Sequence, residues 1–172
     1  DQLAAHLREQ LGSGPIRGLC HGTRNGFEQN HLNCNHAGFE VIGTDISPSA
    51  RDFPNSVEWD FHDVNPEWQG KFDFVYSNSL DQSWQPRAAL AAWLDQVRPG
   101  GVVVIEYSEE QSPLAAGEMD PFGVRPVAVP YVLADWFGHA VSVSFRRGYK
   151  ANIKKPNWLF FIRRNAATPL PA

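Results

Sequence analysis

Apolar residues recur at helical spacing in two stretches of the chain, and two further helices are expected from the residues that begin and end them. Leu3, Leu7 and Leu11 form one such stripe, because residues three or four apart share a helix face. The clearest helix begins at Pro86, since proline fits the first helical turn, and it ends before a Pro-Gly-Gly sequence. The predicted helices are residues 1–12, 27–37 (closed by Gly38), 86–97 and 127–137.

Between these helices lie short apolar runs of the kind that form buried parallel strands. A short helix or turn is expected at Ser47-Pro48, and a long loop over residues 108–126 is rich in Pro, Gly, Glu and Asp. The predicted strands are residues 16–20, 39–45, 57–64, 72–77, 102–107, 140–147 and 158–163.

Alternation of strands with helices predicts a single α/β domain over residues 1–172, with a mostly parallel sheet and helices on both faces. Only a turn separates the last two strands, so they are expected to form an antiparallel hairpin at the sheet edge. Right-handed crossovers bring the loops that follow the parallel strands to one edge of the sheet.

Composition narrows the class of protein. The chain has 42% hydrophobic and 20% charged residues and a net charge of -4, which does not favour nucleic acid as a partner. No segment approaches the roughly 18 apolar residues of a membrane span, and no signal peptide is recognised. Two cysteines, Cys20 and Cys34, do not indicate a disulfide framework and favour a reducing, cytoplasmic setting.

The strongest candidate chemistry begins with a glycine-bearing turn after the first strand. Glycines let the backbone approach a ligand closely, and the helix that follows points free N–H groups at the same space. Asp45 ends the second strand a little over 20 residues later, where nucleotide-binding α/β folds bind ribose hydroxyls; helix capping is the alternative. Asp60, followed by Phe61, is a candidate for an adenine edge, and Asp63 competes for that role.

Taken in order, these motifs resemble the class I S-adenosylmethionine-dependent methyltransferase superfamily. The most specific part is the strand Phe72-Asp-Phe-Val75 followed by the Arg98-Pro-Gly-Gly-Val-Val-Val104 segment. The resemblance covers residues 16–106 motif by motif. It implies a Rossmann-like sheet of seven strands whose last strand inserts antiparallel, and it implies S-adenosylmethionine as cofactor.

The resemblance also assigns cofactor-binding roles. The glycine turn would lie beside the methionine part, Asp45 at the ribose, Ile46 against the adenine face and Asp60-Phe61 at the adenine edge. Asn78 would lie near the reacting methyl group. The predicted cofactor-binding residues are His21, Gly22, Thr23, Arg24, Gly26, Asp45, Ile46, Asp60, Phe61 and Asn78.

The sequence departs from the family in two places. Cys20 stands where the family usually has an acid that helps to hold the cofactor's α-ammonium group, and Arg24 replaces the middle glycine. Arg24 has two interpretations: its guanidinium pairs with the cofactor carboxylate, or it obstructs the site. The helix between the third and fourth strands is also missing, with residues 65–70 in its place.

The resemblance implies a methyltransferase, and a small-molecule acceptor is favoured over a macromolecule because no separate substrate domain is present. Asp81, past the fourth strand, is the candidate base or acceptor-orienting group, and capping of the next helix is the alternative. Loop 108–125 is expected to form the lid. A cofactor-binding protein without catalysis and a nicotinamide-dependent oxidoreductase are the competing hypotheses. Six histidines form no recognisable metal spacing, and His31 and His36 are interpreted as helix surface.

Overall fold

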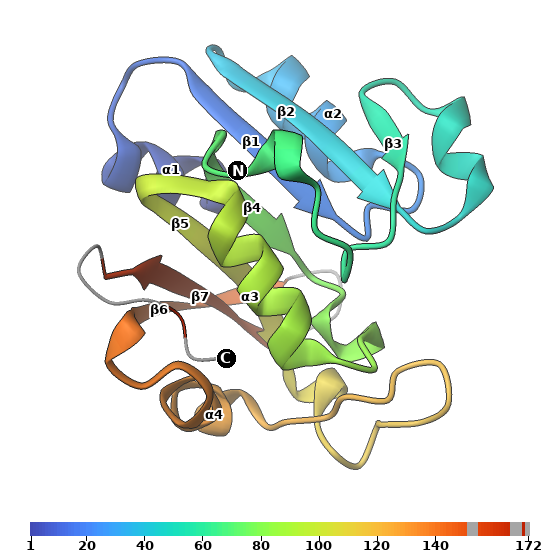
Figure 1. The fold of residues 1–172 in the computed structure, drawn as a ribbon, viewed down its shortest axis with the longest axis vertical. Coiled ribbons are helices and arrows are strands. Elements are labelled where there is room, and N and C mark those ends of the chain that lie inside the picture. The colour runs from blue at the N-terminus through green and yellow to red at the C-terminus, as the bar shows by residue number, and fades with distance from the viewer. Residues whose placement is uncertain (151–154, 166–169, 171–172) are drawn as a thin grey trace.

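The computed structural model describes residues 1–150, 155–165 and 170, and it contains one seven-stranded sheet with helices on both faces. The strand order is β3-β2-β1-β4-β5-β7-β6. Figure 1 shows α3 crossing the front of the sheet, with α1 and α2 on the opposite side. The predicted Rossmann-like α/β architecture is therefore confirmed.

The element bounds follow the predicted order. The α-helices are α1 (Gln2–Leu11), α2 (Phe27–Asn35), α3 (Pro86–Gln96) and α4 (Val129–Phe137). The strands are β1 (Ile16–His21), β2 (Phe39–Asp45), β3 (Ser56–Glu58), β4 (Phe72–Ser77), β5 (Val97–Ser108), β6 (Val141–Lys150) and β7 (Lys155–Arg164). Short 3₁₀ helices are η1 (Pro48–Asp52), η2 (Pro66–Trp68), η3 (Leu80–Gln82), η4 (Glu109–Gln111), η5 (Pro126–Ala128) and η6 (Gly138–Ala140).

The sheet separates two hydrophobic cores because successive strand residues point to opposite faces. Phe74 of β4 packs with Leu7 of α1 and Leu32 of α2 on one face. Its neighbour Val75 packs on the other face with residues of α3 and α4, among them the fully buried Trp93. This alternation fixes which residues at the strand ends point toward each helix layer.

The strands β1, β2, β3, β4 and β5 pair in parallel, and β7 pairs antiparallel with both β5 and β6. The hairpin predicted from the last two strands is therefore confirmed, and β7 inserts between β5 and β6. The arrowheads of β1, β2 and β4 point to the same edge of the sheet in Figure 1. The loops after these strands consequently gather at that edge.

Several element boundaries differ from the prediction; β5, for example, begins at Val97 and not at residue 102, and β6 extends to Lys150. The third strand has three residues and does not reach Val64, because the Asp60 carboxylate accepts a 2.9 Å hydrogen bond from the His62 N–H and closes a turn there. Helix α2 ends at Asn35 with the extended residue His36 as its C-cap. Gly38, predicted as the cap, instead has a φ of +79° in the connection to β2.

The missing helix between β3 and β4 is confirmed, since only η2 stands in its place. A cavity of about 640 Å³ lies along the first half of β2, which β3 does not cover. The Asn33 side chain of α2 exchanges two 2.8 Å hydrogen bonds with the N–H and carbonyl of Val41. This amide satisfies backbone groups at an otherwise open strand edge.

Candidate functional site

The turn after β1 has three residues with positive φ: Gly22 at +69°, Arg24 at +50° and Gly26 at +73°. Gly22 also lies so close to the loop after β4 that a Cβ atom on it would be 2.7 Å from the Ser79 side chain. Glycine is therefore required at Gly22 for both its conformation and its space. Gly26 is the N-cap of α2, so the free N–H groups of that helix face the turn.

Asp45 joins this turn to the end of β2. Its Oδ2 accepts a 2.7 Å hydrogen bond from the Arg24 N–H, and its Oδ1 accepts a 2.9 Å hydrogen bond from the Ser47 N–H. Part of the predicted capping alternative is thus present. A carboxylate has about four acceptor positions, so these two hydrogen bonds leave capacity for hydroxyl donors. The next residue, Ile46, is 61% exposed and offers an apolar surface beside the carboxylate.

The side chains of His21 and Thr23 point into the protein and not toward a ligand. His21 is 1% exposed, lies 2.7 Å from Thr44 Oγ1 and 2.8 Å from Gln96 Oε1, and stacks on Trp93. Burial lowers the pKa of His21 to about 4, so its imidazole is neutral at pH 7. Any contribution of His21 to a cofactor site would come from its backbone.

The turn after β3 is held by a chain of side-chain contacts. Asp60 Oδ1 lies 2.7 Å from His62 Nδ1, and His62 Nε2 lies 2.6 Å from Ser83 Oγ. The half-exposed Trp84 ring stacks on His62 at 3.9 Å between centroids. Ser83 is buried, which excludes it as an accessible nucleophile, so this chain of contacts positions the Asp60 carboxylate.

Phe61 lies in the same turn, where its carbonyl accepts a 3.0 Å hydrogen bond from Trp93 Nε1 of α3. Asp63, the competitor of Asp60, is exposed and makes only backbone contacts among those described, to Asp60 and to Trp59. The half-buried Asp60 is therefore the better-held carboxylate of the two.

Asn78 follows β4 and lies between two cavities. Its Nδ2 donates a 3.4 Å hydrogen bond to Glu28 Oε1 of α2. The buried Tyr76 donates a 3.0 Å hydrogen bond from its hydroxyl to Glu106 Oε2. Asn78 and Glu106 line both a cavity of about 400 Å³ toward α1 and α2 and a cavity of about 250 Å³ toward loop 108–126.

The Glu28 carboxylate was not among the predicted site residues. Burial is the main reason why the pKa values of the Cys20 thiol and the Tyr76 hydroxyl are raised. The negative charge of the nearby Glu28 raises both pKa values further. The only sequence signal for Glu28 is an acid in the first turn of the helix that follows the glycine turn. Its proximity to Cys20 depends on how α2 packs on the sheet.

Asp81 borders the 250 Å³ cavity together with Gln111. Its Oδ1 is buried and has no hydrogen-bond partner among the described residues, and burial raises the pKa of its carboxyl group. Helix α3 has Gln85 as its N-cap, with no side-chain cap. The capping role that competed for Asp81 is therefore not seen. Loop 108–126 returns to this residue, because the Phe122 N–H donates to the Asp81 carbonyl at 2.9 Å.

Comparison with known protein families identifies the chain. A model of the methyltransferase domain matches residues 19–105, half of the chain, from β1 into β5. The chain belongs to the methyltransferase domain family. S-adenosylmethionine is the cofactor of this class I superfamily, and the predicted cofactor-binding residues, from His21 to Asn78, lie in the matched segment. No curated protein matches the sequence closely enough to be related on that basis.

Solved structures share the fold of this methyltransferase. The 1,6-didemethyltoxoflavin-N1-methyltransferase of Burkholderia thailandensis, solved with 1,6-didemethyltoxoflavin and S-adenosylhomocysteine, has a TM-score of 0.72 and 16% identity over 95% of this chain and 77% of its own. A TehB-like methyltransferase of Corynebacterium glutamicum has a TM-score of 0.61 and 18% identity over 94% and 87%. The 16S rRNA (adenine(1408)-N(1))-methyltransferase of Catenulisporales acidiphilia has a TM-score of 0.66 and 14% identity over 98% and 93%.

The residues of this methyltransferase fit the cofactor chemically. Asp45 retains acceptor capacity for hydroxyl groups, and the positive-φ turn exposes the N-terminus of α2 to a carboxylate.

No described helix is long and apolar enough to cross a membrane. Cys20 and Cys34 are both free thiols, as expected.

Proposed function

We propose that the chain transfers a methyl group from S-adenosylmethionine to a small-molecule acceptor. The observation that carries this proposal is the gathering of the glycine turn, Asp45, Asp60 and Asn78 at one sheet edge, where Asn78 lines two cavities. Ligands of open α/β sheets bind outside the carboxyl ends of the strands, and these four groups follow β1, β2, β3 and β4 in turn.

In this proposal the edge residues divide the cofactor between them. The glycine turn and the N-terminus of α2 receive the carboxylate of the methionine part, with the exposed Arg24 as a second positive partner. Asp45 accepts hydrogen bonds from the ribose hydroxyls. The adenine ring lies against Ile46, and its edge meets Asp60 and Phe61.

Glu28 supplies the acid that is missing at position 20. It approaches Cys20 from α2, and its Oε1 is 3.4 Å from Asn78 Nδ2, the residue proposed to lie near the methyl group. A carboxylate is required there because the α-ammonium group of the cofactor carries a positive charge that burial would otherwise destabilise. Glu28 and Arg24 would thus bind the two charged ends of the amino-acid moiety.

The 250 Å³ cavity is the proposed acceptor site. Its volume is close to the lower end of small-ligand pockets, which begin at roughly 300 Å³. Acidic side chains line it, with no Lys or Arg among its described lining residues, so it favours neutral or positively charged acceptors over anions. Its lining residues are Asn78, Asp81, Glu106, Tyr107, Ser108, Glu110 and Gln111. The Burkholderia relative, solved with a small-molecule acceptor, supports the same size class.

Bound S-adenosylmethionine supplies an electrophilic methyl group, and the chain contributes alignment and proton transfer. Much of the rate can come from holding the acceptor close and in line with that group. The Asp81 Oδ1 atom has no hydrogen bond among the described residues, and its raised pKa makes it a better proton acceptor. Asp81 would therefore take the proton from an acceptor N–H or O–H.

Calorimetric titration with S-adenosylmethionine, S-adenosylhomocysteine and NAD tests the proposal. We expect the two sulfur cofactors to bind and NAD not to bind. Turnover is then tested by measuring the release of S-adenosylhomocysteine in the presence of a panel of amine and hydroxyl acceptors. Cofactor binding without turnover on any acceptor would support the non-catalytic binding protein, and NAD binding alone would contradict both hypotheses.

A further inference from the structure

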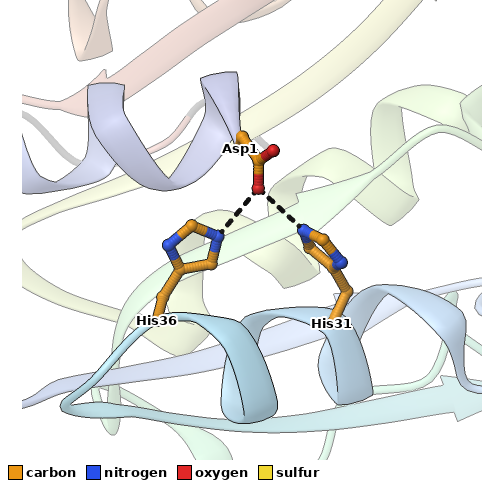
Figure 2. A group of neighbouring side chains, drawn as sticks. All are labelled: Asp1, His31 and His36. Carbon is orange, nitrogen blue, oxygen red and sulfur yellow. Dashed lines mark hydrogen bonds and ion pairs between the residues drawn. The ribbon is translucent and has the colours of Figure 1, made fainter.

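We propose that Asp1, His31 and His36 form a binding site for a divalent transition-metal ion, with Zn²⁺ as the reference metal. Asp1 is the N-cap of α1, His31 lies in the middle of α2 and His36 is the C-cap of α2, on the helix layer opposite α3. Figure 2 shows both imidazole rings directed at the Asp1 carboxylate. The spacing of the histidines in the sequence predicted no metal site, because Asp1 is distant from them along the chain.

The distances suit a metal with nitrogen and oxygen ligands. The Asp1 Oδ1 atom lies 3.1 Å from His31 Nε2 and 3.3 Å from His36 Nε2. All three ligand atoms lie within 4.8 Å of one another. In tetrahedral zinc sites with bonds of about 2.0–2.2 Å, neighbouring ligand atoms are about 3.3–3.5 Å apart, so the two Asp1–histidine separations are already close to the spacing that a bound ion would require.

One ligand atom in this cluster lacks a hydrogen bond. His36 Nε2 is buried from solvent and, despite its 3.3 Å approach to Asp1, forms no hydrogen bond among the described residues. A buried polar atom in this state is an expected feature of an ion site.

Two histidines and one carboxylate leave at least one coordination position for water or another ligand. Asp1 and His31 also line the 400 Å³ cavity that reaches Tyr76 and Asn78, which gives the ion a path from solvent. The ion would connect Asp1, the N-cap of α1, to His31 within α2 and to His36, the C-cap of α2. This metal-binding proposal does not depend on whether the chain is a methyltransferase.

Tag-free protein is titrated with ZnCl₂ by calorimetry and with CoCl₂ by visible absorption. We expect one ion per chain, and the Co²⁺ spectrum should show the d–d bands of a low-coordinate site. His31→Ala and His36→Ala should each weaken Zn²⁺ binding by about 100-fold, because each removes one of three protein ligands. Asp1→Asn should weaken Zn²⁺ binding less than either histidine substitution, because the amide oxygen can still bind the ion, although it is a poorer ligand than a carboxylate.

His6→Ala is the matched control, because His6 is also a partly exposed histidine near an acid, 3.5 Å from Glu9, but lies outside the cluster. This variant should bind Zn²⁺ as the parent protein does. Zn²⁺ should also raise the thermal unfolding temperature of the parent and of His6→Ala, and not that of His31→Ala. Absence of binding at sub-millimolar metal, or binding that survives both cluster histidine substitutions, would overturn the proposal.

Discussion

The Arg24 N–H donates a 2.7 Å hydrogen bond to Asp45 Oδ2, across two loops that are 21 residues apart in sequence. The residue that departs from the family's glycine pattern is thus held by the residue proposed to bind the ribose. Asp45 shapes the turn through this hydrogen bond and, in the proposed function, also binds the ribose. This coupling determines what substitutions at either position should do.

Asp45→Ala should weaken S-adenosylmethionine binding, because a charge-assisted hydrogen bond contributes about 1.5–3 kcal/mol and the turn also loses its anchor. Asp63→Ala is the control, since Asp63 is an exposed aspartate that follows the neighbouring strand β3. Calorimetry on both variants measures the difference. Equal affinities for the two variants would mean that the ribose does not lie at Asp45.

Arg24→Gly should stabilise the protein without cofactor and weaken cofactor binding. At a φ of +50° a side chain costs about 1–2 kcal/mol, part of which is offset by the greater freedom of glycine when unfolded, so a net gain of about 0.5–1 kcal/mol is expected. Urea unfolding measures the first effect and calorimetry the second. Arg24→Lys should also weaken binding, because it loses the fork of donors. Tighter binding by the glycine variant would show that Arg24 obstructs the site.

Glu28→Gln should weaken cofactor binding by roughly tenfold or more while the fold remains intact, because it removes the charge and keeps the shape. Glu40→Gln is the matched control, an exposed glutamate on β2 that is far along the strand from Asp45. Binding constants for S-adenosylmethionine and for decarboxylated or deaminated analogues check the assignment. An effect on the deaminated analogue as large as that on the parent cofactor would contradict contact with the ammonium group.

Asp81→Asn should lower kcat on a proton-losing acceptor by about 100-fold or more and leave cofactor affinity nearly unchanged. The reason is that Asp81 lies at the acceptor cavity and not at the glycine turn. Initial rates of S-adenosylhomocysteine release across pH provide the measurement. Because burial raises the pKa of Asp81, the parent rate should fall as pH drops through that raised value. An unchanged rate would remove Asp81 from the reaction.

His21 should make the protein less stable in mild acid. Its pKa is about 4 when folded and about 6.5 when unfolded, so between these values the unfolded chain binds more protons and stability falls as pH falls. Between pH 7 and 5 the loss due to this residue should be about 2 kcal/mol. Urea unfolding of the parent and of His21→Gln at both pH values isolates it. A parent and a variant with the same pH dependence would contradict the assignment.

The order of helices and strands was predictable because each depends on local periodicity. The Leu3, Leu7 and Leu11 stripe and the proline at the start of α3 mark elements that the structure contains. The third strand was predicted too long, since the turn at Asp60 depends on one side-chain hydrogen bond to the His62 N–H. Boundaries of this kind depend on single contacts and not on periodicity.

The sheet edge at which the cofactor is proposed to bind could be predicted from the sequence alone. Residues that end parallel strands must meet at one edge, so Asp45 and Asn78 could be placed together without coordinates. Which side chains at this edge face the core depends on tertiary packing and was not predictable from the sequence. His21 turned into the core, and Glu28 of α2 came to lie near Cys20 and Asn78. The packing of the helices on the sheet determines these side-chain directions and also brings α1 close to α2. Neither result can be predicted from the local spacing of residues along the chain.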